Sequence, residues 1–197
     1  LLVLLPLGFT LYRAATFGRV NAFELVFRPL VGELLVNTLA ITLSATLASA
    51  FIGTAAAWFV ERTQLPAHRL WGGLCIAPLA MPAFITSYAW VSLSLSLQDF
   101  AGALLVITTA YFPLVYLPVA AALRNMDPAL EESARSLGCS RGAVFLRVVL
   151  PQLRPALLGG MLLVALGVLS EFGAFTLLRF RTFTTQIYAE YRTSFDG

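Results

Sequence analysis

Residues 127–151 read DPALEESARSLGCSRGAVFLRVVLP, a polar and charged segment within a chain that is otherwise apolar. Of the 197 residues, 59% are hydrophobic and only 12% are charged, about half of the roughly 25% found in soluble globular domains. A soluble fold could not bury so much apolar surface, so we expect a lipid bilayer as the solvent. We expect a charged segment between membrane spans to dock to a partner in the aqueous phase.

Four long apolar runs surround this segment. They lie at residues 34–60, 70–98, 100–123 and 155–178, and within the last run only Glu171 carries a charge. Each run exceeds the roughly 20 residues that a helix needs to cross the hydrocarbon core. Because backbone amides find no water inside lipid, these spans are predicted to be helices.

The two ends of the sequence look incomplete. Leu1–Tyr12 is apolar but too short to cross a membrane alone, so we interpret it as the tail of a first span. The C-terminal Ser194–Gly197 looks cut within a loop. The fold class is therefore predicted to be all-α, a polytopic transmembrane helical bundle of about five spans. Residues 1–197 are expected to form one transmembrane domain that is truncated at both ends.

Prolines and small residues within the apolar runs predict how the helices bend and pack. The prolines are Pro78, Pro82, Pro113 and Pro118, and each is expected to kink its helix. Small residues recur near one face of the last run at Ala156, Gly160, Gly167 and Ala174. Their spacing favours close helix packing, with the lining of a transport pathway as the alternative.

Several kinds of chemistry are excluded by the residues that the sequence lacks. It has one histidine, His68, and two cysteines, Cys75 and Cys139, whose spacing matches neither a metal site nor a disulfide framework. Neither of the Gly-rich phosphate-binding patterns, G-x-x-x-x-G-K-[ST] and G-x-G-x-x-G, occurs in the sequence, so we expect no ATP hydrolysis by this chain. We also expect no catalytic, cofactor-binding or metal-binding residues. A net charge of +3 is too small and scattered to indicate nucleic acid as a partner.

Within the polar segment, the sequence predicts two short helices joined by a turn. Asp127 and Pro128 are typical of a helix start, with a side-chain acceptor at the cap and a ring that fits the first helical position. Gly138 fits the left-handed conformation that ends a helix. Ser140 is expected to cap the second helix, and Leu150–Pro151 to end it.

The first of these helices is predicted to be amphipathic. Glu131 and Arg135 are four residues apart and can pair on one face, while Leu130, Ala134 and Leu137 form an apolar stripe on the other. These properties leave two interpretations open. The helices lie on the lipid surface, or they dock to a protein.

The segment resembles the cytoplasmic loop of ATP-binding cassette importer permeases, whose pattern is E-A-A, three residues, G, nine residues and I-x-L-P. The matching positions are Glu132, Ser133, Ala134, Gly138, Val148, Leu150 and Pro151. The spacing agrees throughout, and the departures are Ser133 in place of Ala and Val148 in place of Ile. The chain is accordingly similar to a type I importer permease.

Other short motifs resemble the ferric-iron branch of this family. They are Asn37-Thr38-Leu39, Leu65-Pro66, residues 77–82, Glu171-Phe172-Gly173 and residues 181–185. Together they cover nearly the whole chain. The resemblance implies a multi-pass protein of the inner membrane that imports ferric iron, with thiamine, polyamine, sulfate or phosphonate as alternative substrates.

The resemblance also implies partners and residue roles. Residues 124–153 are expected to form a coupling loop that docks in a groove of a cytoplasmic ATPase. Glu132 is the candidate for a charged contact, Gly138 for the turn, and Ala134 and Leu137 for apolar contacts. A periplasmic substrate-binding protein and a second permease half or subunit are the other expected partners, besides membrane lipid.

Three polar residues are candidates for the transport pathway. Glu171 lies within an apolar run, where a carboxylate is costly and tends to face a cavity or a partner. Its alternative role is an interfacial carboxylate near the outer end of the span, with Phe172 and Phe175 anchored around it. Asn37 and Thr38 are candidates for lining the pathway, although buried hydrogen bonds between helices explain them equally well.

Two other functional classes remain open at this level. An intramembrane enzyme would need paired polar groups at membrane depth, and only Glu171 stands there without an obvious partner. A structural membrane anchor would not require the spacing of the loop motif. Co-purification of a cytoplasmic ATPase distinguishes the permease from both.

Overall fold

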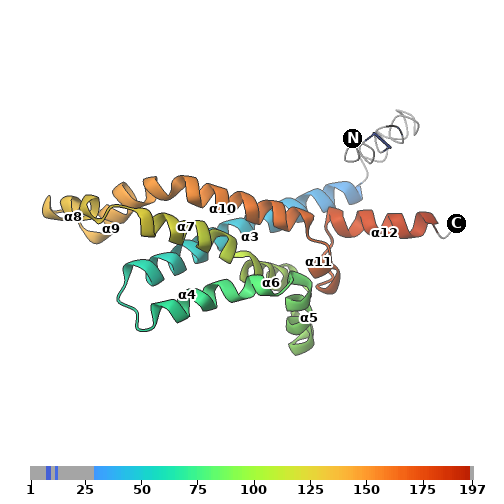
Figure 1. The fold of residues 1–197 in the computed structure, drawn as a ribbon. Coiled ribbons are helices and arrows are strands. Elements are labelled where there is room, and N and C mark those ends of the chain that lie inside the picture. The colour runs from blue at the N-terminus through green and yellow to red at the C-terminus, as the bar shows by residue number, and fades with distance from the viewer. Residues whose placement is uncertain (1–7, 10–11, 13–28, 196–197) are drawn as a thin grey trace.

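The computed structural model describes residues 8–9, 12 and 29–195, and all regular elements within these ranges are helices (Figure 1). The helices are α3 (Pro29–Arg62), α4 (His68–Ile76), α5 (Ala83–Leu93), α6 (Phe100–Tyr111), α7 (Pro113–Asn125), α8 (Pro128–Ser136), α9 (Arg141–Val144), α10 (Leu150–Ser170), α11 (Gly173–Leu177) and α12 (Phe183–Phe195). Turns of 3-10 helix lie at Ala77–Ala80 and Leu95–Leu97, and a π-helical turn lies at Phe145–Val149. The predicted all-helical fold is confirmed.

Three helical stretches in the described part are long and apolar enough to cross a membrane. They are Pro29–Arg62, Phe100–Asn125 and Arg141–Ser170. The bent pair His68–Ala80 and Ala83–Leu93 makes a fourth if it is counted as one span. The additional partial span predicted at Leu1–Tyr12 lies almost wholly outside the described residues.

The predicted span at 70–98 is not a straight helix, because its two halves meet at 94°. Met81 is extended, with φ −114° and ψ 125°, and Pro82 is the N-cap residue of α5. A proline ring pushes the preceding residue out of the helical conformation and offers no N–H to continue the ladder. Pro82 therefore breaks this span rather than merely kinking it.

The last predicted run, 155–178, is interrupted in its C-terminal half. Helix α10 stops at Ser170, because Glu171 is extended with ψ 129°. The chain then restarts as the short helix α11. The charged residue within the run therefore marks the end of the spanning helix.

The prediction that Leu150–Pro151 ends a helix is wrong. Helix α9 continues through the π-helical turn into α10, so that Pro151 lies in the first turn of α10. A wider turn accommodates a proline ring that would crowd the carbonyl four residues earlier in an ordinary helix. Gln152 supports this turn, because its Nε2 donates a hydrogen bond of 3.0 Å to the carbonyl of Val148.

The core of the bundle forms where α3 and α10 pack on α7. A β-carbon on Gly53 of α3 would lie 2.9 Å from the backbone of Phe112 and Tyr116. A β-carbon on Gly160 of α10 would lie 2.8 Å from the Cα atom of Val115. These two glycines let the three backbones approach closely, as the small-residue spacing predicted for Gly160.

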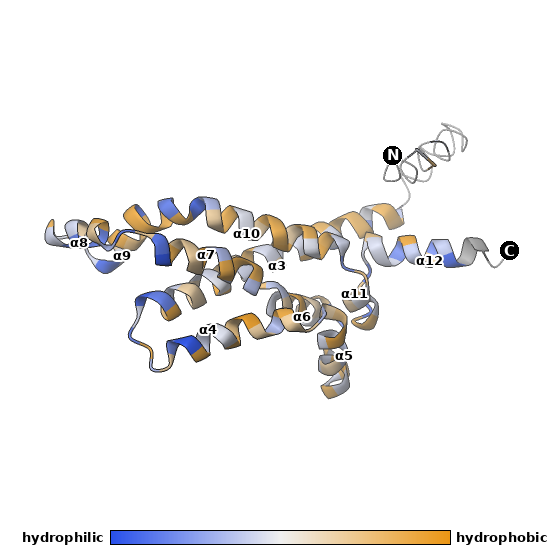
Figure 2. Ribbon diagram, in the orientation of Figure 1, coloured by the Kyte–Doolittle hydropathy of each residue, from blue (hydrophilic) through white to orange (hydrophobic). Residues whose placement is uncertain are grey.

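The outer faces of the long helices carry large exposed apolar side chains. They include Leu43, Leu47 and Phe51 on α3, and Leu158, Leu162 and Leu166 on α10. Figure 2 shows hydrophobic residues along α3, α7 and α10, with hydrophilic residues gathered near α8, α9 and the loop after α3. The bundle thus has a lipid-compatible middle and a polar end formed by α8 and α9.

Candidate functional site

Helices α8 and α9 form a hairpin at one end of the bundle (Figure 1), and local sequence features build it. Asp127 Oδ1 accepts a hydrogen bond of 2.9 Å from the N–H of Ala129, and Ser140 Oγ accepts one of 3.3 Å from the N–H of Ala143. Gly138 has φ +84° and joins the two helices. The predicted caps and the predicted turn are confirmed.

The hairpin exposes several of the residues that the motif singles out. Glu132, Ser133 and Gly138 are exposed, and the side chain of Leu137 is 84% exposed. Leu130, on the same helix, is 49% exposed. Ala134 is half-buried, so the predicted apolar stripe is largely uncovered.

The other motif residues lie where the hairpin joins the bundle. Val148, Leu150 and Pro151 are half-buried in the π-helical turn and the start of α10. Their position connects the hairpin to a spanning helix without a loop in between. A displacement of the hairpin would therefore act directly on α10.

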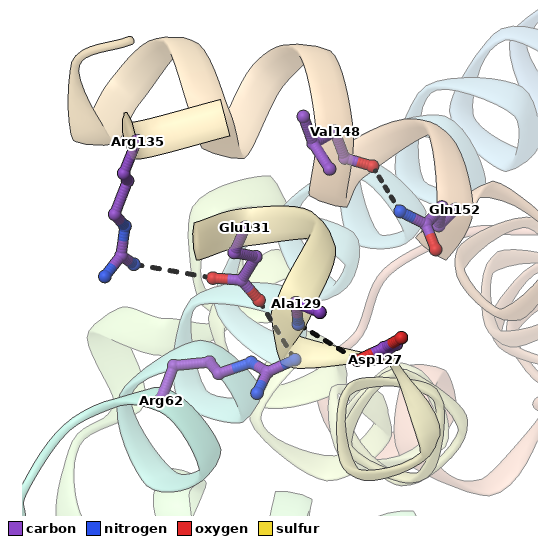
Figure 3. A network of polar contacts seen from close by, with 7 residues as sticks. All are labelled: Arg62, Asp127, Ala129, Glu131, Arg135, Val148 and Gln152. Carbon is purple, nitrogen blue, oxygen red and sulfur yellow. Dashed lines mark hydrogen bonds and ion pairs between the residues drawn. The ribbon is translucent and has the colours of Figure 1, made fainter. Parts of the chain in front are cut away.

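Glu131, unlike the exposed Glu132, is buried, with 6% of its surface exposed. Its Oε1 lies 3.0 Å from Arg62 Nη2 at the last residue of α3, and its Oε2 lies 3.5 Å from Arg135 Nη2 (Figure 3). The Arg62 contact is an ion pair without the alignment of a hydrogen bond. One carboxylate thus holds α8 to the end of α3.

A third ion pair involves the residue that precedes Arg62. Arg124 Nη2, near the end of α7, is 2.6 Å from Oε1 of Glu61, the residue before Arg62. The consecutive residues Glu61 and Arg62 therefore tie the end of α3 to both α7 and α8. Sequence reasoning predicted the pair of Glu131 with Arg135 but not these longer-range pairs, because no local spacing indicates them.

An aromatic contact also fixes the π-helical turn, which follows the hairpin, to α3. The rings of Trp58 and Phe145 meet edge to face, with centroids 4.9 Å apart. Val144 and Val149, on either side of Phe145, are buried against the bundle. The hairpin is thus attached to α3 by charge at α8 and by packing at the π-helical turn that follows α9.

At the other end of α10, Glu171 uses both carboxylate oxygens for contacts within the chain. Its Oε2 accepts a hydrogen bond of 2.7 Å from the hydroxyl of Tyr111, and its Oε1 accepts one of 2.9 Å from the N–H of Ala174. The hydroxyl of Thr184 donates to its backbone carbonyl at 2.7 Å. Glu171 therefore connects α10, α6 and α11, and its pathway role stays a prediction.

Asn37 and Thr38 contact the segment that precedes α12. Asn37 Nδ2 donates to the carbonyl of Arg181 at 3.3 Å, and Thr38 Oγ1 accepts from the N–H of Phe183 at 3.2 Å. These bonds join residues that are far apart in the sequence. The role of Asn37 and Thr38 in a pathway also stays a prediction. Within the described part of the chain, no three His, Cys, Asp or Glu residues lie close enough to hold a metal ion.

Comparison with known proteins finds a family and several relatives. Residues 50–196 match the family described as binding-protein-dependent transport system inner membrane component. The chain is 38% identical over 193 residues to the Fe(3+)-transport system permease protein FbpB 2 of Haemophilus influenzae, which covers 98% of this chain and 38% of that protein. It therefore spans well under half of that relative.

Two further relatives are named for different substrates. The sulfate transport system permease protein CysT of Escherichia coli is 30% identical over 190 residues, covering 88% of this chain and 68% of that protein. The molybdenum transport system permease protein ModB of Escherichia coli is 29% identical over 166 residues, covering 76% and 70%.

Proposed function

The chain belongs to the family of binding-protein-dependent transport system inner membrane components, and we propose that it forms the substrate pathway of an ATP-binding cassette importer. It is a multi-pass protein of the inner membrane, with helices long enough to cross it. In this proposal residues 1–197 belong to one permease domain, and residues 124–153 are its coupling loop. The importer also includes a periplasmic binding protein and a second permease half or subunit.

The single observation that carries the proposal is the outward face of the hairpin. Leu130 and Leu137 are exposed at the polar end of the bundle, and Glu132 of the same hairpin is exposed as well. Exposed leucines beside a charge suit a protein groove, which buries apolar side chains at its centre and pairs charges at its rim. We assign this face to the cytoplasmic ATPase.

The attachments of the hairpin support a mechanical role. The hairpin continues into α10 through the π-helical turn, and it is held to α3 by the pair of Arg62 with Glu131. When ATP binding moves the ATPase subunits, the hairpin carries α10 and α3 with it as one packed unit. The spanning helices then alternate between inward-open and outward-open arrangements.

Replacing Leu137 with Asp tests this function. We expect Leu137→Asp to insert normally but to lose co-purification of the ATPase, because a charge replaces the apolar contact. The matched control is Leu95→Asp, a leucine that is 73% exposed in the turn between α5 and α6. Equal recovery of the ATPase with Leu137→Asp and with Leu95→Asp would contradict the proposal. It would favour a role for the protein as a structural membrane anchor.

Ferric iron is the substrate that we propose, since the iron-transport relative is 38% identical over 98% of the chain. The sulfate and molybdate relatives are 30% and 29% identical over shorter parts of it. Uptake of radiolabelled ferric iron by cells with and without the intact permease tests this choice. Unchanged iron uptake combined with lost sulfate uptake would move the assignment to an oxyanion.

A further inference from the structure

A large cavity lies between the second half of α3 and the elements that carry the hairpin. Its volume is about 1120 Å³, which exceeds the roughly 300–1,000 Å³ of ordinary small-molecule sites. Residues of α3 form one wall, and residues of α9, the π-helical turn and α10 form the other. The proposed docking face, made by Leu130, Glu132 and Leu137, does not line the cavity.

All the charged residues that line the cavity are positively charged. Arg62, Arg135 and Arg141 line it, and none of its lining residues is acidic. Arg62 and Arg135 share the single carboxylate of Glu131, whereas Arg141 has no ion-pair partner among the residues that the structure describes. The lining thus carries three guanidinium groups, of which two are paired with one carboxylate. The side chain of Arg62 is largely buried, whereas Arg135 and Arg141 are exposed. This excess of positive charge favours an anionic occupant.

Other lining residues are apolar and extend along the spanning helices. They include Phe51, Phe59 and Leu157. Phe51 precedes Arg62 by three helical turns, which corresponds to about 16 Å along the axis at 1.5 Å per residue. The headgroup layer on one side of a bilayer is only roughly 5–8 Å thick. The cavity therefore runs from the headgroup layer into the hydrocarbon.

We propose that this cavity is a binding site for one anionic phospholipid. Its phosphate pairs with Arg141 and with the outward atoms of Arg62 and Arg135, and an acyl chain lies along Phe51, Phe59 and Leu157. An acidic segment of a cytoplasmic protein fits the arginines but cannot reach Phe51 without entering the hydrocarbon. The combination of arginines at the interface with an apolar wall above them is that of a site for acidic lipid headgroups.

The test uses the assembled transporter in nanodiscs that contain phosphatidylglycerol or phosphatidylcholine. Native mass spectrometry of the released complex counts the lipids that remain bound. We expect phosphatidylglycerol to be retained preferentially, and Arg141→Gln to weaken its apparent affinity about fivefold, since one basic residue near an anionic surface contributes roughly that factor. Arg154→Gln, an exposed arginine of α10 outside the cavity lining, should leave retention unchanged.

Three outcomes would overturn the proposal. They are equal retention of the two lipids, equal effects of Arg141→Gln and Arg154→Gln, and a photo-reactive residue at Phe59 that crosslinks to a protein segment instead of to lipid. A lipid adduct at Phe59 that is lost with Arg141→Gln supports it. The result is independent of ATPase docking, because Leu137→Asp should not change lipid retention.

Discussion

Glu131 and Glu132 are adjacent in α8 but lie in different environments. Glu131 is buried and paired with two arginines, whereas Glu132 is exposed. Removing a buried carboxylate leaves the positive charge of its partners buried without a counter-charge. Removing an exposed carboxylate costs little, because water replaces its contacts. The two residues therefore separate the internal attachment of the hairpin from its outer surface.

Glu131→Gln should lower the free energy of unfolding by about 1–3 kcal/mol, because Arg62 loses its counter-charge in a largely buried position. Glu132→Gln should leave stability unchanged. Thermal denaturation of the two purified variants, followed by size-exclusion chromatography, makes the comparison. Equal midpoints for Glu131→Gln and the parent protein would show that the ion pair does not hold α8 to α3.

Gly138 is needed for its backbone conformation rather than for space. Its φ is +84°, and a β-carbon there would meet nothing within 4 Å. A left-handed residue with a β-carbon costs roughly 1–2 kcal/mol. Gly138→Ala should therefore insert normally but reduce coupled transport, whereas Gly142→Ala, which also has open space and no positive φ, should behave like the parent. Transport rates in proteoliposomes distinguish the two variants. Full activity of Gly138→Ala would contradict the claim that coupling needs a glycine at this turn.

At the scale of elements, two neighbouring glycines of α10 make a matched comparison. A β-carbon on Gly160 would lie 2.8 Å from the backbone of α7, whereas one on Gly159 would meet nothing within 4 Å. Gly160→Ala should destabilise the bundle by forcing the helices apart. Gly159→Ala should be neutral or stabilising by up to about 1 kcal/mol through helix propensity. Thermal midpoints in detergent measure both, and a stable Gly160→Ala variant would contradict the close packing.

The local features of the hairpin could be predicted from the sequence because their causes are local. Asp127, Gly138 and Ser140 act through backbone atoms within a few residues of themselves. The prediction at Pro151 was wrong because proline occurs both just after a helix end and in the first turn of a helix. The π-helical turn before it, which the sequence does not reveal, places Pro151 in a first turn. Pro82 was placed in the correct span, but the size of its bend depends on how α4 and α5 pack.

The contacts between distant elements could not be predicted. Arg62 of α3 contacts Glu131 of α8 at the polar end of the bundle, and Tyr111 contacts Glu171 at the other end of α10. No periodicity in one sequence indicates such partners, since they depend on how the helices are arranged. The candidate coupling residues could be proposed from the sequence because their motif is local, whereas the residues that anchor the hairpin to the bundle could not.

At the scale of the whole molecule, α10 links two anchored ends. The hairpin and Arg62 form one end, and Glu171, with its contacts to Tyr111 and Thr184, forms the other. A helix that is fixed at both ends transmits movement between them instead of absorbing it in a flexible loop. This arrangement suits a permease whose motor lies on one side of the membrane and whose substrate arrives on the other.

Crosslinking from position 137 in living cells tests the central claim most directly. A photo-reactive amino acid replaces Leu137 in the intact transporter, and a second variant carries it at Leu95 as a control. The account predicts that position 137 forms an adduct with the cytoplasmic ATPase and that position 95 does not. Adducts from position 137 with lipid alone, or with a protein on the periplasmic side, would contradict the assignment of the hairpin as the coupling element.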